Sequence, residues 1–148
     1  MRPTYKTFFA MIGVSSFTMY LTMYLNTYSL DHVFFSEMRL YINLLATAVM
    51  TLVMLWFMRS MYSHAKVNKL IVAGSIGLFL VALFLVRSQV LVDDVDYMEA
   101  MIPHHSIAIL ASERAQIEDP RVRALADDII EAQKREIAEM KQLIEELK

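Results

Sequence analysis

The chain contains no cysteine. Disulfide bonds are therefore excluded, and so are the thiolate ligands that structural zinc sites and iron–sulfur clusters usually use. The absence of cysteine is compatible with a domain outside the cytoplasm but does not require one, because such domains can equally carry disulfides. Any metal chemistry in this chain has to rely on other donors.

Acidic residues are scarce in the first 86 residues, which hold six Lys/Arg and two Asp/Glu, a balance of +4. Residues 87–148 show the opposite, with eight Lys/Arg and fourteen Asp/Glu, a balance of −6. The chain therefore consists of an apolar part and a charged part that meet near Arg87. Because the charged part is acidic, we expect no nucleic-acid partner.

Charged residues and histidine are absent from three stretches of the apolar part: Phe8–Leu25, Leu40–Met58 and Leu70–Val86. Each is close to the ~20 residues that a helix needs to cross a bilayer. No small-residue cleavage pattern follows the first stretch, which favours a retained anchor over a signal peptide. The sequence predicts a membrane domain over residues 1–87 with three transmembrane helices.

The distribution of basic residues predicts how these helices are oriented. Arg2 and Lys6 precede the first stretch, and Arg59, Lys66 and Lys69 lie between the second and the third. The positive-inside rule places both of these segments in the cytoplasm. Three crossings then put residues 88–148 on the periplasmic or extracellular side. We expect a multi-pass protein of the inner (cytoplasmic) membrane with a cytoplasmic amino terminus.

Residues 88–148 show helical periodicity and no strand pattern. Asp96 and Glu99 indicate a capped helix that runs to about Gln116, with a kink at Pro103. Asp119 followed by Pro120 indicates the start of a second helix. The predicted fold class is all-α: three transmembrane helices followed by an antiparallel helical hairpin.

A hairpin of this size buries too little apolar surface to be stable alone. A second copy would complete a four-helix bundle, so we expect a homodimer or another homo-oligomer. The alternatives are docking on the membrane part of the chain or on another protein.

Methionine and histidine are concentrated at the start of the hairpin. The first helix carries Met98, Met101, His104 and His105, and the second carries Gln133, Glu136 and Met140 on one face. Thioether and imidazole donors together suit Cu(I). The candidate metal ligands are therefore Met98, Met101, His104, His105 and Met140.

The two histidines point about 100° apart on a helix. We expect His105 to face the hairpin and His104 to face a partner or solvent. Gln133 and Glu136 interrupt the apolar side of the second helix, and they are either ligands or hydrogen-bond partners that orient the histidines. His32, in the loop after the first apolar stretch, could approach the same domain.

Residues 96–147 resemble the domain of unknown function 305 (DUF305) family. The matching residues are Asp96, Met101, His104, His105, Ala108, Ala111, Leu125, Ala126, Gln133, Glu136, Ile137 and Met140. The resemblance implies a helical, ferritin-like bundle that is commonly exported, and some members bind copper or silver ions outside the cytoplasm. The three apolar stretches are similar to a membrane-anchored subgroup. Leu110 replaces a methionine that is frequent in the family, and no tryptophan follows Met140.

These observations predict a membrane-anchored protein that binds Cu(I) or Ag(I) outside the cytoplasm, for copper handling or resistance, with copper-handling membrane proteins as possible partners. The alternative is a non-catalytic accessory subunit whose hairpin is a protein–protein interface. We expect no enzyme, because the chain has no Glu-x-x-His motif for a di-iron site, no nucleophile elbow and no phosphate loop. A methionine stripe at residues 50, 54, 58 and 61 either passes Cu(I) or packs.

Overall fold

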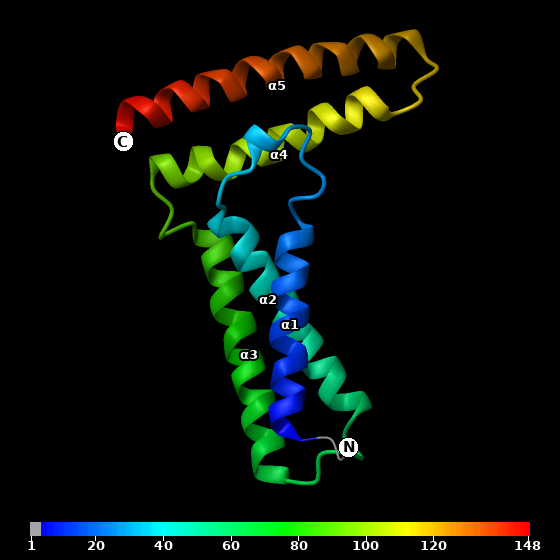
Figure 1. Ribbon diagram of the computed structural model, residues 1–148, viewed down its shortest axis with the longest axis vertical. Helices are drawn as coiled ribbons and strands as arrows, with labels where there is room; N and C mark the ends of the chain where they lie inside the picture. The colour runs from blue at the N-terminus through cyan, green and yellow to red at the C-terminus, as the bar shows by residue number, and fades with distance from the viewer. Residues whose placement is uncertain (1–3) are drawn as a thin grey trace. The chain divides into compact units, whose positions relative to one another are not determined.

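The computed structural model describes residues 4–148, and every regular element in this range is helical. In chain order the elements are α1 (Tyr5–Thr22), the short 3-10 helix η1 (Leu30–His32), α2 (Glu37–Phe57), α3 (Ala65–Ser88), α4 (Asp94–Arg114) and α5 (Pro120–Leu147) (Figure 1). The described residues form no strand, and the all-α prediction is confirmed for them.

The chain divides into two compact units. The first, here called the apolar unit, combines α1 with Met38–Leu91. The second, here called the hairpin unit, combines Met23–Glu37 with Val92–Lys148. The division differs from a simple cut after residue 87, because the loop that precedes α2 folds with the C-terminal helices.

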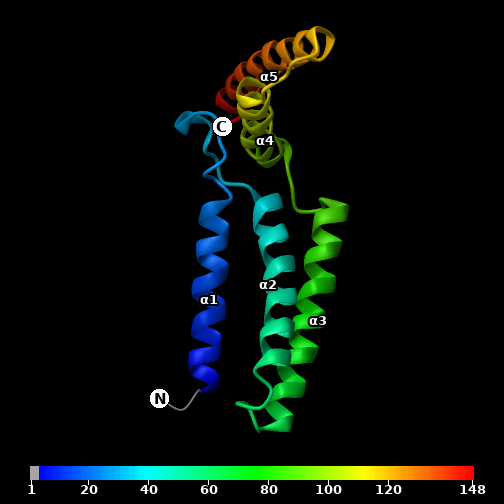
Figure 2. The ribbon, with the colours of Figure 1, turned by 90° about the vertical axis from the view of Figure 1, so that its right-hand side faces the viewer.

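In the apolar unit, α1, α2 and α3 lie lengthwise beside one another (Figures 1 and 2). Phe8 and Ile12 of α1 form a buried cluster with Leu55 and Ile71 of the other two helices and with the Tyr62 ring. The Tyr5 hydroxyl of α1 donates a hydrogen bond to Asn68 Oδ1 at 2.8 Å. These contacts fix the start of α1 against the connection between α2 and α3.

Two helices among the described residues are long and apolar enough to cross a membrane: α2 with 21 residues and α3 with 24. α1 is not one of them, although a first span was expected over Phe8–Leu25. It has 18 residues, ends at Thr22, and includes Lys6 and several Ser and Thr residues. These polar groups make α1 less apolar than the other two helices. The structure thus supports two of the three predicted spans.

The methionine stripe of α2 lies against the apolar core. Met50, Met54 and Met58 pack against the buried cluster, whereas Met61 is exposed. Methionine fills irregular gaps between helices because its side chain is flexible. Three of the four stripe residues are therefore packing residues in this structure.

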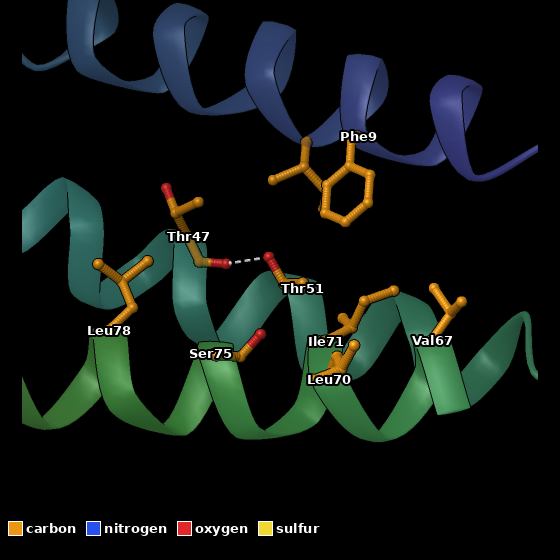
Figure 3. A pocket seen from close by; sticks show the side chains of 10 residues that line it. Phe9, Thr47, Thr51, Val67, Leu70, Ile71, Ser75 and Leu78 are labelled. Carbon is orange, nitrogen blue, oxygen red and sulfur yellow. Dashed lines mark hydrogen bonds between the residues drawn. The ribbon is translucent and has the colours of Figure 1, made fainter. Parts of the chain in front are cut away.

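A groove of about 460 Å³ opens between the three helices of the apolar unit (Figure 3). Its walls are apolar except for the hydroxyls of Thr47, Thr51 and Ser75. Thr51 donates to the Thr47 carbonyl at 2.7 Å. A hydroxyl that bonds the preceding helical turn in this way can lie in apolar surroundings without a further partner.

Both helices of the hairpin unit begin at an aspartate cap. Asp119 accepts from the Arg121 amide at the start of α5, and Pro120 occupies the first turn, as predicted. α4 begins one turn earlier than predicted, because Asp93 is its cap. Asp93 accepts from the Asp96 amide at 2.9 Å, and Asp96 accepts from the Asp93 amide in return. Asp96 is thus the second member of the capping box rather than the cap itself.

The hairpin core is formed by apolar residues of α4 and α5 together with the loop before α2. Met98, Ile102 and Ile109 of α4 pack against Ile137 and Ile144 of α5. A further residue, Phe34 of the loop, packs against this cluster. The additional layer that the hairpin requires is therefore supplied in part by the chain itself, and the described residues hold two long antiparallel helices rather than a complete four-helix bundle.

The loop is held to α4 by Ser106, which is 0% exposed. The Tyr28 amide donates to Ser106 Oγ at 2.7 Å, and His32 Nδ1 lies 3.0 Å from the same oxygen. Lys141 of α5 pairs with Asp31 of the loop. We call this set of contacts the Ser106 clasp. It confirms that His32 approaches the C-terminal domain.

Candidate metal site

A groove of about 470 Å³ runs between α4 and α5. Its lining residues are Asp94, Tyr97, Met98, Met101, His105, Glu136, Glu139, Met140, Leu143 and Leu147. Four of the five predicted ligands are therefore brought together around one cavity: Met98, Met101, His105 and Met140. The antiparallel arrangement accounts for this, because Met140 lies near the end of α5 that returns beside the start of α4.

The imidazole of His105 is fixed at both of its nitrogens. Nδ1 lies 2.9 Å from the Met101 carbonyl, one turn earlier in α4. Nε2 lies 2.8 Å from Glu136 Oε2 on α5. The Met101 carbonyl can only accept a hydrogen bond, so Nδ1 is the donor in the first contact, and Nε2 is the nitrogen beside the Glu136 carboxylate.

The contact with the Met101 carbonyl decides which nitrogen is available to a metal ion. Metal-bound histidines usually donate their other ring N–H to a carbonyl or carboxylate, which fixes the ring. Nδ1 of His105 already makes that bond, so Nε2 is the nitrogen that faces the groove. A metal ion held by Nε2 would take the place of the Glu136 carboxylate beside that nitrogen.

The thioethers differ in exposure. Met98 is buried, at 6% exposure, within the hairpin core. Met101 and Met140 are half-buried, and Met140 packs against the same core. Three methionines and one histidine line the groove, and thioether and imidazole groups form a donor set that is compatible with a monovalent d¹⁰ ion.

Side chains with oxygen, nitrogen or thiolate donors are less clustered than the methionine thioethers of the groove. Within residues 4–148, no three or more His, Cys, Asp or Glu side chains are grouped so that they could hold a metal ion. His105 and Glu136 lie together, but no third side chain of these four types joins them within the described residues. The thioethers are a separate donor class, and the candidate site depends on them.

The family model for the domain of unknown function DUF305 matches residues 93–148, from the cap of α4 through α5. Uncharacterized protein L153 of Acanthamoeba polyphaga mimivirus is 32% identical in an alignment of 146 positions that covers 94% of this chain and 94% of that protein. This chain belongs to the DUF305 family. The viral relative matches the apolar unit as well as the DUF305 domain. No solved structure matches the chain.

Two predicted site residues of the DUF305 domain lie away from the groove. His104 is exposed, with its ring centroid 6.0 Å from that of His105. It faces outward, as the helical spacing indicated. Gln133 is half-buried but does not line the groove. Since His105 pairs with Glu136, Gln133 lies one turn closer to the connection between the helices. A metal-binding role for any of these residues stays a prediction.

The sequence analysis did not identify Ser106 of the DUF305 domain. A serine between Ile102 and Ile109, on a side of α4 that must be covered, is the signal that could have indicated it. The clasp also places His32 in a partly buried position, and burial lowers the pKa of His32 below its ordinary value of 6.5. The Asp31 carboxylate opposes this effect. The Lys141 ammonium, followed by the Ser29 hydroxyl, lowers the pKa of Asp31 itself.

Proposed function

We propose that the protein binds a soft monovalent ion, Cu(I) or Ag(I), in the α4–α5 groove of a membrane-anchored domain outside the cytoplasm. The observation that carries the proposal is that Met98, Met101, His105 and Met140 line one cavity. Thioethers are poor ligands for hard cations, and Zn²⁺ gains little from them.

The composition of the hairpin unit supports the proposed topology. Met23–Glu37 and Val92–Lys148 fold together, so both segments lie on the same side of a membrane. α2 and α3 lie between them in the chain, and two crossings return the chain to its starting side. The connection between α2 and α3 carries Arg59, and Lys66 lies in the first turn of α3. Both favour the cytoplasm for that connection and therefore the outer side for the hairpin unit.

α1 is less apolar than α2 and α3, but Phe8 and Ile12 pack it against both of them, and on this ground it completes the proposed anchor as a third span. Lys6 near its beginning favours a cytoplasmic amino terminus. The outer position of the hairpin unit does not depend on this assignment, because it follows from α2, α3 and their connection. The proposed location is the inner (cytoplasmic) membrane with a periplasmic or extracellular hairpin unit.

Each residue of the site has a distinct proposed role. Met101, Met140 and His105 hold the ion, with Met98 at the base of the groove. Glu136, 2.8 Å from Nε2, competes with the ion for this nitrogen. His104, exposed on the neighbouring face, is suited to receive or pass on an ion at the surface. These roles fit copper storage, delivery or detoxification together with copper-handling membrane proteins.

Titration of the detergent-solubilised full chain with Ag(I), against a chromophoric competitor, tests the proposal. We expect Met101→Leu and His105→Ala each to weaken binding by at least ~10-fold, because changes to a partner of a metal ligand alone cost 10–100-fold. Met61→Leu, an exposed methionine of the other unit, is the matched control. If both variants bind as tightly as the parent chain, the assigned site is wrong.

An interaction module is the second candidate function. The observation that favours it is a row of exposed apolar side chains along α5, which a metal site does not require. An interface hairpin binds no stoichiometric Ag(I) in the same titration, so one measurement separates the two functions.

A further inference from the structure

The outward side of α5 carries large apolar side chains that no described part of the chain covers. Their exposure ranges from 37% to 59%, and we call them the α5 stripe: Val122, Leu125, Ile129, Leu143 and Leu147. The buried residues of α5 are Ala126, Ile137 and Ile144. α4 runs along one side of α5 (Figure 1). The apolar face of α5 is therefore wider than its contact with α4.

The α5 stripe is continuous with the candidate metal groove. Leu143 and Leu147 belong to both, and Glu136 lies between the two halves of the stripe. A partner that covers the stripe therefore also closes the groove beside His105.

Reversal of the helix about a point between residues 134 and 135 places apolar positions of α5 opposite apolar positions, although Val122 and Leu147 are the only stripe residues that match each other. A second α5 that runs antiparallel, centred between residues 134 and 135, places Val122 opposite Leu147. The same register places Ile129 opposite Met140. At the centre, Gln133 of one copy lies opposite Glu136 of the other, where an amide N–H can donate to a carboxylate. A two-fold interface requires this kind of self-complementary patch.

We infer that two copies of this chain pair through antiparallel α5 helices, so that the α5 of each copy covers the groove of the other. Two hairpins then form a four-helix arrangement. The pairing itself does not depend on a metal ion. Its consequence for the ion rests on the proposed function: the dimer excludes water from both grooves and strengthens the interactions inside them.

A second copy fits this surface better than a lipid bilayer does. Helices that lie on membranes carry mainly Lys and Arg beside their apolar face. The residues that border the α5 stripe have both signs of charge: Arg121, Asp128, Arg135, Glu139 and Glu146. Mixed charges of this kind are typical of the rim of a protein–protein interface.

Cysteine cross-linking of the full chain in detergent tests the register, and the natural chain offers no competing thiol. In an antiparallel pair, the two copies of residue 132 lie about 8 Å apart along the axis. Ala132→Cys should therefore react efficiently with a short bismaleimide. Ala138→Cys, the same change on the opposite face of α5, should not. The two copies of residue 125 are about 28 Å apart in this register. Equal cross-linking at 132 and 138, or efficient cross-linking of Leu125→Cys to itself, overturns the inference.

Light scattering of the metal-free full chain tests the pairing. We expect a dimer, and a dissociation constant at least ~100-fold higher for Ile129→Glu/Leu143→Glu, because charges buried without partners are strongly unfavourable. Ala124→Glu/Ala138→Glu adds the same charges on the opposite, exposed face and should remain a dimer. A strictly monomeric parent chain overturns the inference. Ag(I) titration of that monomer then decides the proposed function separately.

Discussion

Replacement of Ser106 by alanine should weaken the attachment of the loop Met23–Glu37 to α4 while the contacts between α4 and α5 remain in place. The change removes the oxygen that accepts from the Tyr28 amide at 2.7 Å and contacts His32 Nδ1 at 3.0 Å. A buried donor left without a partner costs about 1–3 kcal/mol. Both contacts are only partly buried, so water partly replaces the lost oxygen. We therefore expect the free energy that favours the closed clasp over the open one to fall by about 1–2 kcal/mol, the lower part of the cost of an unpaired buried donor.

Hydrogen–deuterium exchange of the full chain in detergent reads this effect at the Tyr28 amide. A loss of 1–2 kcal/mol corresponds to an increase in the opening equilibrium of about 5- to 30-fold. Ser112→Ala, the same change further along α4, is the control, and exchange at Tyr28 should not change in this variant. If Ser106→Ala leaves the Tyr28 exchange rate equal to that of the control, the clasp does not hold the loop.

Three further outcomes are expected. Burial lowers the pKa of His32, so the folded state favours the neutral ring, and the stability of the clasp should fall as the pH drops below the unfolded value of 6.5. The exchange rate of the Tyr28 amide, corrected for its intrinsic pH dependence, measures this loss of stability, and His32→Gln should remove it. Glu136→Ala should tighten Ag(I) binding by up to about fivefold, the equivalent of a partly exposed ion pair, and a weaker affinity would show that Glu136 supports the ion instead. Ile102→Ala, at a position with 0% exposure, should lower the free energy of unfolding of the hairpin unit by about 2–5 kcal/mol, as measured by chemical denaturation.

The helices of the hairpin unit could be predicted because their signals are local. Asp119 and Pro120 define the start of α5 without any tertiary information. The predicted start of α4 was wrong by one turn, because the sequence contains two overlapping capping patterns, one that begins at Asp93 and one that begins at Asp96. Helical periodicity alone was enough to place Met101 and His105 on one face. The register between α4 and α5, which determines that Gln133 lies away from the groove, is a tertiary property.

The contacts of the loop could not be derived from periodicity. The Tyr28–Ser106 bond joins residues 78 positions apart, and the Asp31–Lys141 pair joins residues 110 positions apart. Neither residue of such a pair carries a local pattern that points to the other. The first predicted span was inferred from a stretch without charged residues. Such a stretch indicates a helix, but the Ser and Thr residues of α1 leave it less apolar than α2 and α3.

The discontinuity of the hairpin unit has a consequence for how the protein is made. Met23–Glu37 is synthesised before α2 and α3, and its binding surface on α4 and α5 is synthesised after them. Ser106 and Lys141, which hold the loop in the clasp, do not exist until both apolar helices have been synthesised, so the clasp forms late and through contacts of high sequence separation. A fragment limited to residues 93–148 lacks Phe34 and the whole loop. The two apolar helices are thus an insertion within the folding unit, and the segment that defines the family is only the larger of its two pieces.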